Sequence, residues 1–469
     1  WSGLGVGAAL GFVCFPCAGP ILGAVISVSV SGGASARVVL IALAYAVGLS
    51  AVMLLYGLGG RAVLSRIRRR AQGHTVERAL GVILVVTGIL IATNVDVRFE
   101  EALARDTSLP AILVDPTRSL ENSSAVQNQL ASLRPASRFA LRQQREAAAV
   151  PVSTAPGVAI PGVRTPSLPR LGPAPDFTRT ERWFNTPHGA PLHLAQLRGK
   201  VVLVDFWTYT CINCIRTLPF LKGLWATYHR YGLEIVGVET PEFTFEQEAG
   251  NVAQAIASDG LRYPVVQDNA YGTWNAYQNQ YWPAEYLIDA QGQVRHTQFG
   301  EGNYRADEAA VRSLLYAAGA HHLPPPMTAH AIVPSAQLAT PETYLDPQRA
   351  QGFAQPLRAG VHFYPGVINP PLDTFGLHGT WRVSSQSATP TSAGASITAR
   401  YQAADVYLVL TSAGDRPRTV SVTVDGRPAP PVTVQGQHLY TLVHRAAAGP
   451  HTLTVGIPPG VSAYDFTFG

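Results

Sequence analysis

The chain has 469 residues, enough for about two to four domains of ordinary size, and its formal net charge is +5. Only 14% of the residues are charged and the mean hydropathy is +0.11, which is apolar for a soluble protein. The positive charge lies at the front, because residues 1–95 hold seven arginines and one glutamate and the remainder carries a net charge of −1. The basic balance is therefore no evidence for nucleic-acid binding.

Three apolar stretches contain no charged residue: Leu4–Val30, Val38–Gly59 and Ala79–Val95. The first two are long enough to span a bilayer, whereas the third approaches the roughly 20 residues needed and could instead form a buried or interfacial helix. The segment RAVLSRIRRR (61–70) carries five arginines, so the positive-inside rule places it in the cytoplasm. We predict a transmembrane region of three helices over 1–95, with the rest of the chain in an oxidising extracytoplasmic compartment.

The first apolar stretch contains Cys14 and Cys17, with Pro16 and Pro20 around the second cysteine. Prolines in a membrane helix are tolerated where a cavity or a neighbouring helix compensates the lost backbone bonds. The chain begins with Trp1 and not with Met, so we expect an N-terminally truncated sequence. Cys14 and Cys17 could pair with each other, which a helical i, i+3 spacing allows, or both could be inert buried thiols.

Residues 96–172 show weak periodicity and many helix breakers, and we interpret them as a Pro-rich linker. A short helix is predicted over Ser137–Ala149. The final part, 151–175, has a proline at about every fifth residue and is typical of an extended, semi-rigid tether.

The most informative motif follows the apolar strand Lys200–Trp207, where the sequence CINC places Cys211 and Cys214 on the first turn of a predicted helix. The free N–H groups and the positive dipole end of the helix stabilise a thiolate at Cys211. We predict that Cys211 attacks a disulfide and that Cys214 resolves the mixed disulfide. A zinc site would need four ligands and a structural disulfide is the other alternative, but the remaining cysteines lie in the apolar front, which favours a redox pair.

Three further residues are candidates for the same site. Pro283 precedes the apolar strand YLID, Asp205 lies inside an apolar strand where a charge is costly, and Glu239 ends the predicted strand Leu233–Val238. Burial would raise the pKa of either carboxyl group towards neutrality. The alternatives are carboxylates exposed at strand ends and an ordinary proline at a strand start.

Residues 321–469 open with HHLPPPM and then contain short strand-like runs at the spacing of an all-β sandwich. These runs are SITARY (396–401), DVYLVL (405–410), TVSVTVDG (419–426), HLYTLV (438–443), HTLTVGI (451–457) and AYDFTFG (463–469). Asp425-Gly426 is a strong hairpin signal. Four aromatic residues form either a sugar-stacking platform or ordinary core and strand positions: Trp381, Tyr401, Tyr407 and Tyr440.

Residues 173–320 resemble the TlpA-like redoxins of the thioredoxin superfamily, through PAPDF (173–177), LAQLRGKVVLVDFW (194–207), YGLEIVGVET (231–240) and YWPAEYLIDAQGQV (281–294). The resemblance implies an α/β thioredoxin-like fold in which Pro283 is a cis-proline facing the cysteine pair. It also implies that Asp205 relays protons to and from the resolving cysteine and that Glu239 lies near the pair. Ile212-Asn213 differs from the dipeptides usual in the family, so the direction of electron flow stays open.

The segment PCAGP (16–20) resembles the motif of the second half of the CcdA family, the membrane thiol transporters related to DsbD, and this places Cys17 at the family cysteine. The resemblance implies that a first half is missing and that Cys17 pairs with a cysteine of that half, as the alternative to pairing with Cys14. The region from PETYLDPQRAQGF (341–353) to the end resembles the carbohydrate-binding-module-like jelly roll of DipZ-type proteins of actinobacteria. The expected multi-domain arrangement is a membrane region (1–95), a linker (96–172), a redoxin (173–320) and a β-sandwich (321–469).

These resemblances imply a multi-pass protein of the cytoplasmic membrane that acts as an extracytoplasmic thiol–disulfide oxidoreductase. Electrons would pass from a cytoplasmic thioredoxin through the membrane cysteines to Cys211 and Cys214, then to envelope proteins or apocytochrome c. We expect no cofactor beyond the cysteine pair, no metal and no nucleic acid. Covalent c-type haem is excluded because no histidine follows Cys17 or Cys214. The alternatives are an oxidase that introduces disulfides and a cell-surface glycan-binding protein with an incidental redoxin.

Overall fold

The computed structural model describes residues 137–149, 168–327 and 340–469. The described residues belong to one compact unit, Ala136–Gly469. The predicted membrane region, with Cys14, Pro16, Cys17 and Pro20, lies outside the described residues. Within the described ranges, no helix combines the length and the apolar character needed to cross a bilayer.

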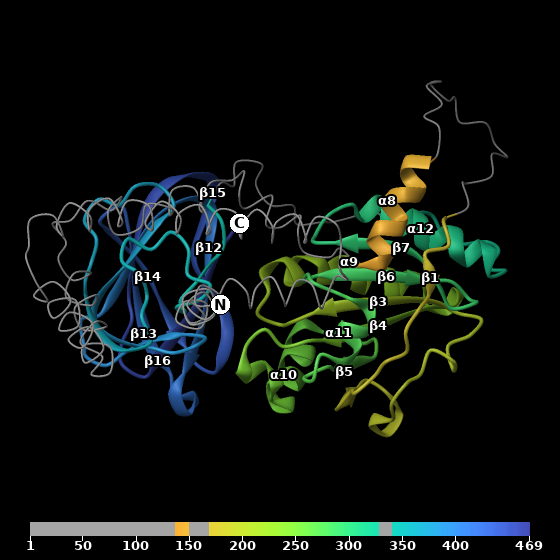
Figure 1. Ribbon diagram of the computed structural model, residues 1–469, viewed down its shortest axis with the longest axis horizontal. Coiled ribbons are helices and arrows are strands. Elements are labelled where there is room, and N and C mark those ends of the chain that lie inside the picture. The colour runs from red at the N-terminus through yellow and green to blue at the C-terminus, as the bar shows by residue number, and fades with distance from the viewer. Residues whose placement is uncertain (1–136, 150–167, 328–339) are drawn as a thin grey trace, which may run out of the picture. The chain divides into compact units, whose positions relative to one another are not determined.

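A seven-stranded sheet forms the centre of the redox domain, our name for residues 168–327, with strand order β1-β7-β6-β3-β4-β5-β2 (Figure 1). Strands β3, β4 and β5 are parallel, and β6 runs antiparallel to both β3 and β7. Every residue of β3 and β4 is buried, as their apolar runs predict for central strands. The strands are β1 (Gly172–Pro173), β2 (Trp183–Phe184), β3 (Val201–Trp207), β4 (Leu233–Glu239), β5 (Val265–Gln267), β6 (Ala284–Ile288) and β7 (Gln293–Phe299).

Helices cover both faces of this sheet. Successive side chains of a strand point to opposite faces, so the buried strands β3 and β4 present apolar side chains on both sides. Leu203 of β3 joins a core cluster with Leu221 and Leu314 from two helices, whereas Val204 joins the opposite cluster with Tyr277. The α-helices are α9 (Ile212–Tyr228), α10 (Ala249–Asp259), α11 (Gly272–Tyr277) and α12 (Tyr304–Ala317); the 3-10 helices are η1 (Pro187–Gly189), η2 (His229–Tyr231) and η3 (Thr244–Gln247).

The linker helix predicted over 137–149 exists as α8 (Arg138–Ala149), and it is docked on the redox domain. Its Phe139 is fully buried and meets the Tyr286 ring edge-on at 5.9 Å. Gln143 donates to the Thr297 carbonyl at 3.0 Å and accepts from the Thr297 amide at 2.7 Å. Because β1 also pairs with β7, the end of the predicted extended tether is part of the sheet of the redox domain.

The second described region, 340–469, is called the β domain below. Its nine strands follow the order β14-β13-β15-β12-β10-β11-β16-β8, with β9 paired to β10. The elements are β8 (Thr343–Tyr344), β9 (Gly360–Pro365), β10 (Thr374–Val383), β11 (Ala388–Pro390), β12 (Ser396–Ser412), η4 (Ala413–Asp415), β13 (Arg418–Val424), β14 (Arg427–Val434), β15 (Gln437–Gly456) and β16 (Val461–Phe468).

Two pairs of predicted short strands are single long strands in the structure. β12 contains both 396–401 and 405–410, and β15 contains 438–443 and most of 451–457. The pairing shifts register between Ala403 and Asp405, so the strand continues through an irregularity instead of ending in a turn. The predicted hairpin is confirmed: Asp425 (φ 52°) and Gly426 (φ 74°) both have positive φ, as a type I′ turn between β13 and β14 requires.

Of the two alternatives for the four aromatic residues, two of them, Trp381 and Tyr401, fit the core position and not the sugar-stacking platform. Trp381 and Tyr401 have no exposed surface and belong to the core of the β domain, where they cannot stack on a sugar. Tyr440 is half-buried and its hydroxyl donates to the carbonyl of Gln435, which lies between β14 and β15. Tyr407 is also half-buried and lies under the guanidinium of Arg216 from the redox domain.

Candidate active site

The two cysteines of the CINC motif differ in exposure and share one backbone contact. Cys211 is the N-cap of α9 and is half-buried, whereas Cys214 is 1% exposed; both thiols are free. The amide of Cys214 donates to the Cys211 sulfur at 3.3 Å. An N–H donor at a helix N-terminus is the arrangement that stabilises a thiolate.

The sulfur of Cys214 has the opposite environment. Burial, followed by the hydrogen bond and the charge of Cys211, raises the pKa of the Cys214 thiol well above its usual range. A sulfur that keeps its proton in the interior is a poor first nucleophile. The arrangement therefore suits attack by Cys211 and later resolution by Cys214, after a neighbouring group has taken its proton.

Asp205 is such a neighbour. It lies on β3, is 1% exposed, and neither carboxylate oxygen has a hydrogen-bond partner among the described residues. Burial raises its pKa to about 7. The charge of Asp205 in turn contributes to the raised pKa of Cys214. The burial predicted for Asp205 from its apolar strand is confirmed.

Glu285 was missed by the sequence interpretation. It is the cross-strand partner of Asp205 on β6 and is 5% exposed. Burial, followed by the charges of Asp307 and Asp205, raises its pKa well above the usual range. Its signal in the sequence was a glutamate inside the apolar strand AEYLI, the same pattern that drew attention to Asp205.

Glu239 ends β4 and is fully buried, as predicted. It accepts a hydrogen bond from the Thr208 hydroxyl at 3.3 Å. Burial raises its pKa well above the usual range, and the charge of Glu246 adds to this shift. The structure thus brings Glu239 to the segment that immediately precedes Cys211.

Glu246, in η3, is a second residue that the sequence interpretation missed. It is fully buried and accepts from the Thr210 hydroxyl at 2.5 Å. Its other oxygen accepts from the amides of Glu242 at 2.6 Å and Phe243 at 2.9 Å. Burial raises its pKa to about 7. Because Thr210 directly precedes Cys211, Glu246 anchors the backbone that carries the accessible thiol.

The peptide bond between Trp282 and Pro283 is cis, in agreement with the geometry that the resemblance implied. Pro283 is buried. The Trp282 indole donates to the Thr240 carbonyl at 3.1 Å, and the Thr240 amide donates to the Trp207 carbonyl at 3.0 Å. The proline segment is thereby tied to the ends of β3 and β4. A substrate-facing role for Pro283 remains a proposal.

Arg216, on the first turns of α9, is a third residue that was missed. Its side chain is 5% exposed and makes an ion pair with Glu301 at 3.1 Å. It also donates to the carbonyl of Phe468 in the β domain at 3.5 Å. In the part of the chain that the structure describes, no group of three or more His, Cys, Asp or Glu side chains could hold a metal ion.

Two family models match the described regions. The "AhpC/TSA family" model matches residues 172–297, and the "Thioredoxin like C-terminal domain" model matches residues 340–469. The thiol–disulfide oxidoreductase YkuV of Bacillus subtilis is 28% identical over 144 residues, covering 30% of this chain and 94% of its own length. ResA of Geobacillus kaustophilus is 32% identical over 124 residues, covering 26% of this chain and 64% of its own. The redox domain is a thioredoxin-like thiol–disulfide oxidoreductase.

Similarity over the full chain points to a more particular relative. The chain is homologous to Protein DipZ of Mycobacterium bovis and of Mycobacterium tuberculosis, at 33% identity over 488 aligned residues that cover all of this chain. The chain spans 64% of the length of these relatives.

Proposed function

We propose that this protein is a membrane-anchored, extracytoplasmic thiol–disulfide oxidoreductase that reduces disulfides of envelope proteins. The observation that carries the proposal is the asymmetric pair: Cys211 is accessible at the N-terminus of α9, and Cys214 is buried with a thiol of raised pKa. The similarity to oxidoreductases that use the same fold supports it.

The chemistry moves two electrons and two protons. The Cys211 thiolate attacks one sulfur of a substrate disulfide, the substrate S–S bond breaks, and its leaving sulfur takes up a proton. Asp205 then accepts the proton of Cys214, and the Cys214 thiolate attacks the Cys211 sulfur. The mixed disulfide breaks, the second substrate thiol leaves with a proton, and Cys211 and Cys214 end as a disulfide. Glu239 and Pro283 would position the reacting segment.

The pair must then be reduced again by another dithiol. In our proposal this dithiol lies in the membrane region and includes Cys17, which receives electrons from a cytoplasmic thioredoxin. The charge pattern supports the topology, because five arginines at 61–70 favour a cytoplasmic loop and leave the redox domain on the outer side. Apocytochrome c awaiting haem is one acceptor of the proposed kind.

The reduction potential of the Cys211–Cys214 pair tests the direction of electron flow. The full chain is equilibrated with defined glutathione or dithiothreitol ratios, and the dithiol fraction is measured by thiol labelling. A reductase is expected to lie near the roughly −270 mV of thioredoxin, whereas a value near the roughly −120 mV of DsbA would contradict reduction and indicate an oxidase. A Cys17→Ser variant should keep the potential and lose re-reduction in membranes.

A further inference from the structure

One short loop connects the redox site with the β domain. Residues 240–247, called the site loop below, follow β4 directly. On the side of the redox site, Thr240 accepts from Trp282 and Glu246 accepts from Thr210, the residue before Cys211. On its other side, the same loop sends Glu242 and Thr244 into contacts with the β domain.

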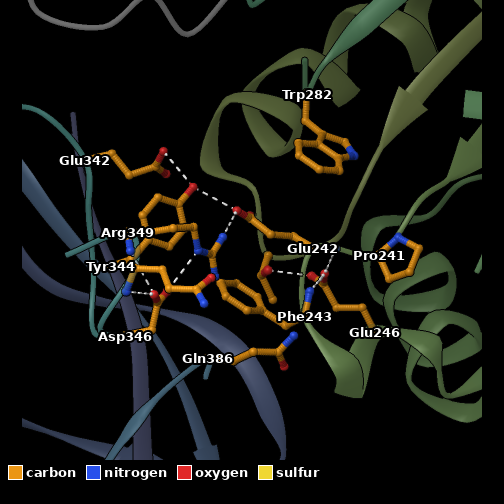
Figure 2. A network of polar contacts seen from close by, with 12 residues as sticks. Pro241, Glu242, Phe243, Glu246, Trp282, Glu342, Tyr344, Asp346, Arg349 and Gln386 are labelled. Atoms are coloured by element: carbon orange, nitrogen blue, oxygen red, sulfur yellow. Dashed lines mark hydrogen bonds and ion pairs between the residues drawn. The ribbon is translucent and has the colours of Figure 1, made fainter. Parts of the chain in front are cut away.

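The strongest of these contacts surrounds the carboxylate of Glu242. Figure 2 shows Tyr344 and Arg349 of the β domain converging on it: the Tyr344 hydroxyl donates at 2.7 Å and the Arg349 guanidinium at 3.0 Å. Arg349 is itself held by Asp346 at 2.9 Å and lies 3.9 Å from the centre of the Tyr344 ring. The Glu242 side chain is only 13% exposed, so its charge depends on this guanidinium.

Two neighbouring contacts hold the rest of the site loop. The Gln386 side-chain oxygen accepts from the Thr244 amide at 3.1 Å and from its hydroxyl at 2.7 Å. Phe243 and Phe245 meet the Tyr464 ring edge-on at 5.1 and 5.0 Å. The β domain therefore holds the site loop through the charge of Arg349, the side-chain amide of Gln386 and the aromatic ring of Tyr464.

The β domain also touches both sides of the CINC motif itself. After the motif, Arg216 reaches the Phe468 carbonyl and lies over the Tyr407 ring at 5.8 Å. Before the motif, the Tyr209 ring lies 6.5 Å from the His438 ring. The β domain therefore contacts the site loop and a residue on either side of the CINC motif.

We propose that the β domain sets the reactivity of the redox pair, with Arg349 and Tyr344 as positioning residues that act through Glu242 and the site loop on Thr210 and Cys211. The proposal rests on the proposed function only in taking Cys211 and Cys214 as the exchanging pair. Without Arg349, the mostly buried Glu242 loses its ion-pair partner and the site loop loses its main contact with the β domain. A released site loop no longer fixes Thr210 and the segment before Cys211, and this disfavours the Cys211 thiolate and the reduced state it stabilises.

The test compares Arg349→Gln with Arg418→Gln in the full chain. Arg418 is a matched control, because it is also half-buried and, among the described residues, its hydrogen bonds go to Ser412, Ala413 and Arg416 of the β domain. The readouts are the rate of Cys211 alkylation by iodoacetamide at pH 7 and the reduction potential against glutathione. R349Q should slow alkylation about fivefold and make the potential more negative, whereas R418Q should match the parent.

A second comparison separates positioning from loss of folding. In the double variant Glu242→Gln with Arg349→Gln, the site loop no longer carries a carboxyl group that has lost its guanidinium, and Asp346 keeps the amides of Gln348 and Arg349 as donors, so alkylation should return towards the parent rate. Tyr344→Phe removes one hydroxyl and should give a smaller shift in the same direction. Parent-like alkylation and potential in folded R349Q and Y344F would overturn the positioning role. A parent chain that exchanges no disulfide would instead contradict the proposed function.

Discussion

Asp205 on β3 and Glu285 on β6 are direct cross-strand partners, and both are almost completely buried. Each lies two residues from a leucine of its own strand, Leu203 or Leu287, and therefore on the same face of the sheet as that leucine. Both leucines belong to the core cluster that contains Cys214. Burial raises the pKa of Glu285 well above its usual range and that of Asp205 to about 7. Asp205 is therefore a group on the Cys214 side of the sheet that titrates near neutral pH.

Replacing Asp205 with Asn should slow the resolving step about a hundredfold, because Cys214 loses its proton acceptor. In the parent, the rate of mixed-disulfide resolution should rise as pH increases through 7 and Asp205 ionises. Stopped-flow kinetics between pH 6 and about pH 9 measure both effects. Glu285→Gln is the control and should keep this rise. A D205N variant whose resolution rate still rises as pH increases through 7 would exclude Asp205 as the proton acceptor.

The same substitution should stabilise the folded chain at alkaline pH. The pKa of Asp205 rises from 3.8 to about 7 on folding, so its contribution to stability is fully present below pH 3.8 and is lost as pH rises through 7. An asparagine at this position does not ionise, so the variant does not lose this stability as pH rises. We expect D205N to gain up to about 4 kcal/mol at pH 8 and less than half of that at pH 5. Urea unfolding at both pH values is the measurement, and an equal difference at both would refute the assignment.

Replacing either cysteine with Ser should separate attack from resolution. Cys214→Ser leaves the accessible Cys211 thiol and should accumulate mixed disulfides, because the second sulfur is absent. Cys211→Ser should form almost none, since Cys214 is 1% exposed. Non-reducing gels and mass spectrometry after exposure to a disulfide substrate show the adducts. Equal trapping by the two variants would mean that the roles are not divided as proposed.

Glu246→Ala should destabilise the redox domain by about 3 kcal/mol, because three donors lose a buried acceptor: the Thr210 hydroxyl and the amides of Glu242 and Phe243. Glu248→Ala, at an exposed position two residues along the chain, is the control and should change stability by about 0.5 kcal/mol or less. Urea unfolding followed by tryptophan fluorescence measures both. Similar losses in the two variants would show that Glu246 is not an anchor.

Gly237 should tolerate no side chain, although its backbone is ordinary strand. A Cβ there would lie 3.0 Å from the Trp207 indole nitrogen and 3.3 Å from the Tyr263 ring, both fully buried. Gly237→Ala should cost about 1–3 kcal/mol. Gly250→Ala, on α10 with nothing within 4 Å, should instead gain about 0.5–1 kcal/mol. The denaturant midpoints of the two variants measure both effects. A G237A variant as stable as the parent would contradict the close contact of position 237 with Trp207 and Tyr263.

Local patterns were enough to predict several features of the described residues. The run before CINC predicted β3, and Asp425-Gly426 predicted the hairpin between β13 and β14. In each of these the physical cause lies within a few neighbouring residues. The long strands β12 and β15 were predicted only in pieces, because a strand that bends through a register shift looks interrupted in sequence.

The sequence by itself determined the redox chemistry: two cysteines at helical spacing after a buried strand, and a carboxylate inside that strand. Only the tertiary structure decided which other groups surround the pair. Glu285 gains its meaning from cross-strand pairing with Asp205, and Glu246 from a fold that brings it to Thr210, 36 residues earlier. Arg349 and Tyr344 reach Glu242 across 107 and 102 residues. Such contacts depend on where separate elements pack, and no local pattern encodes that.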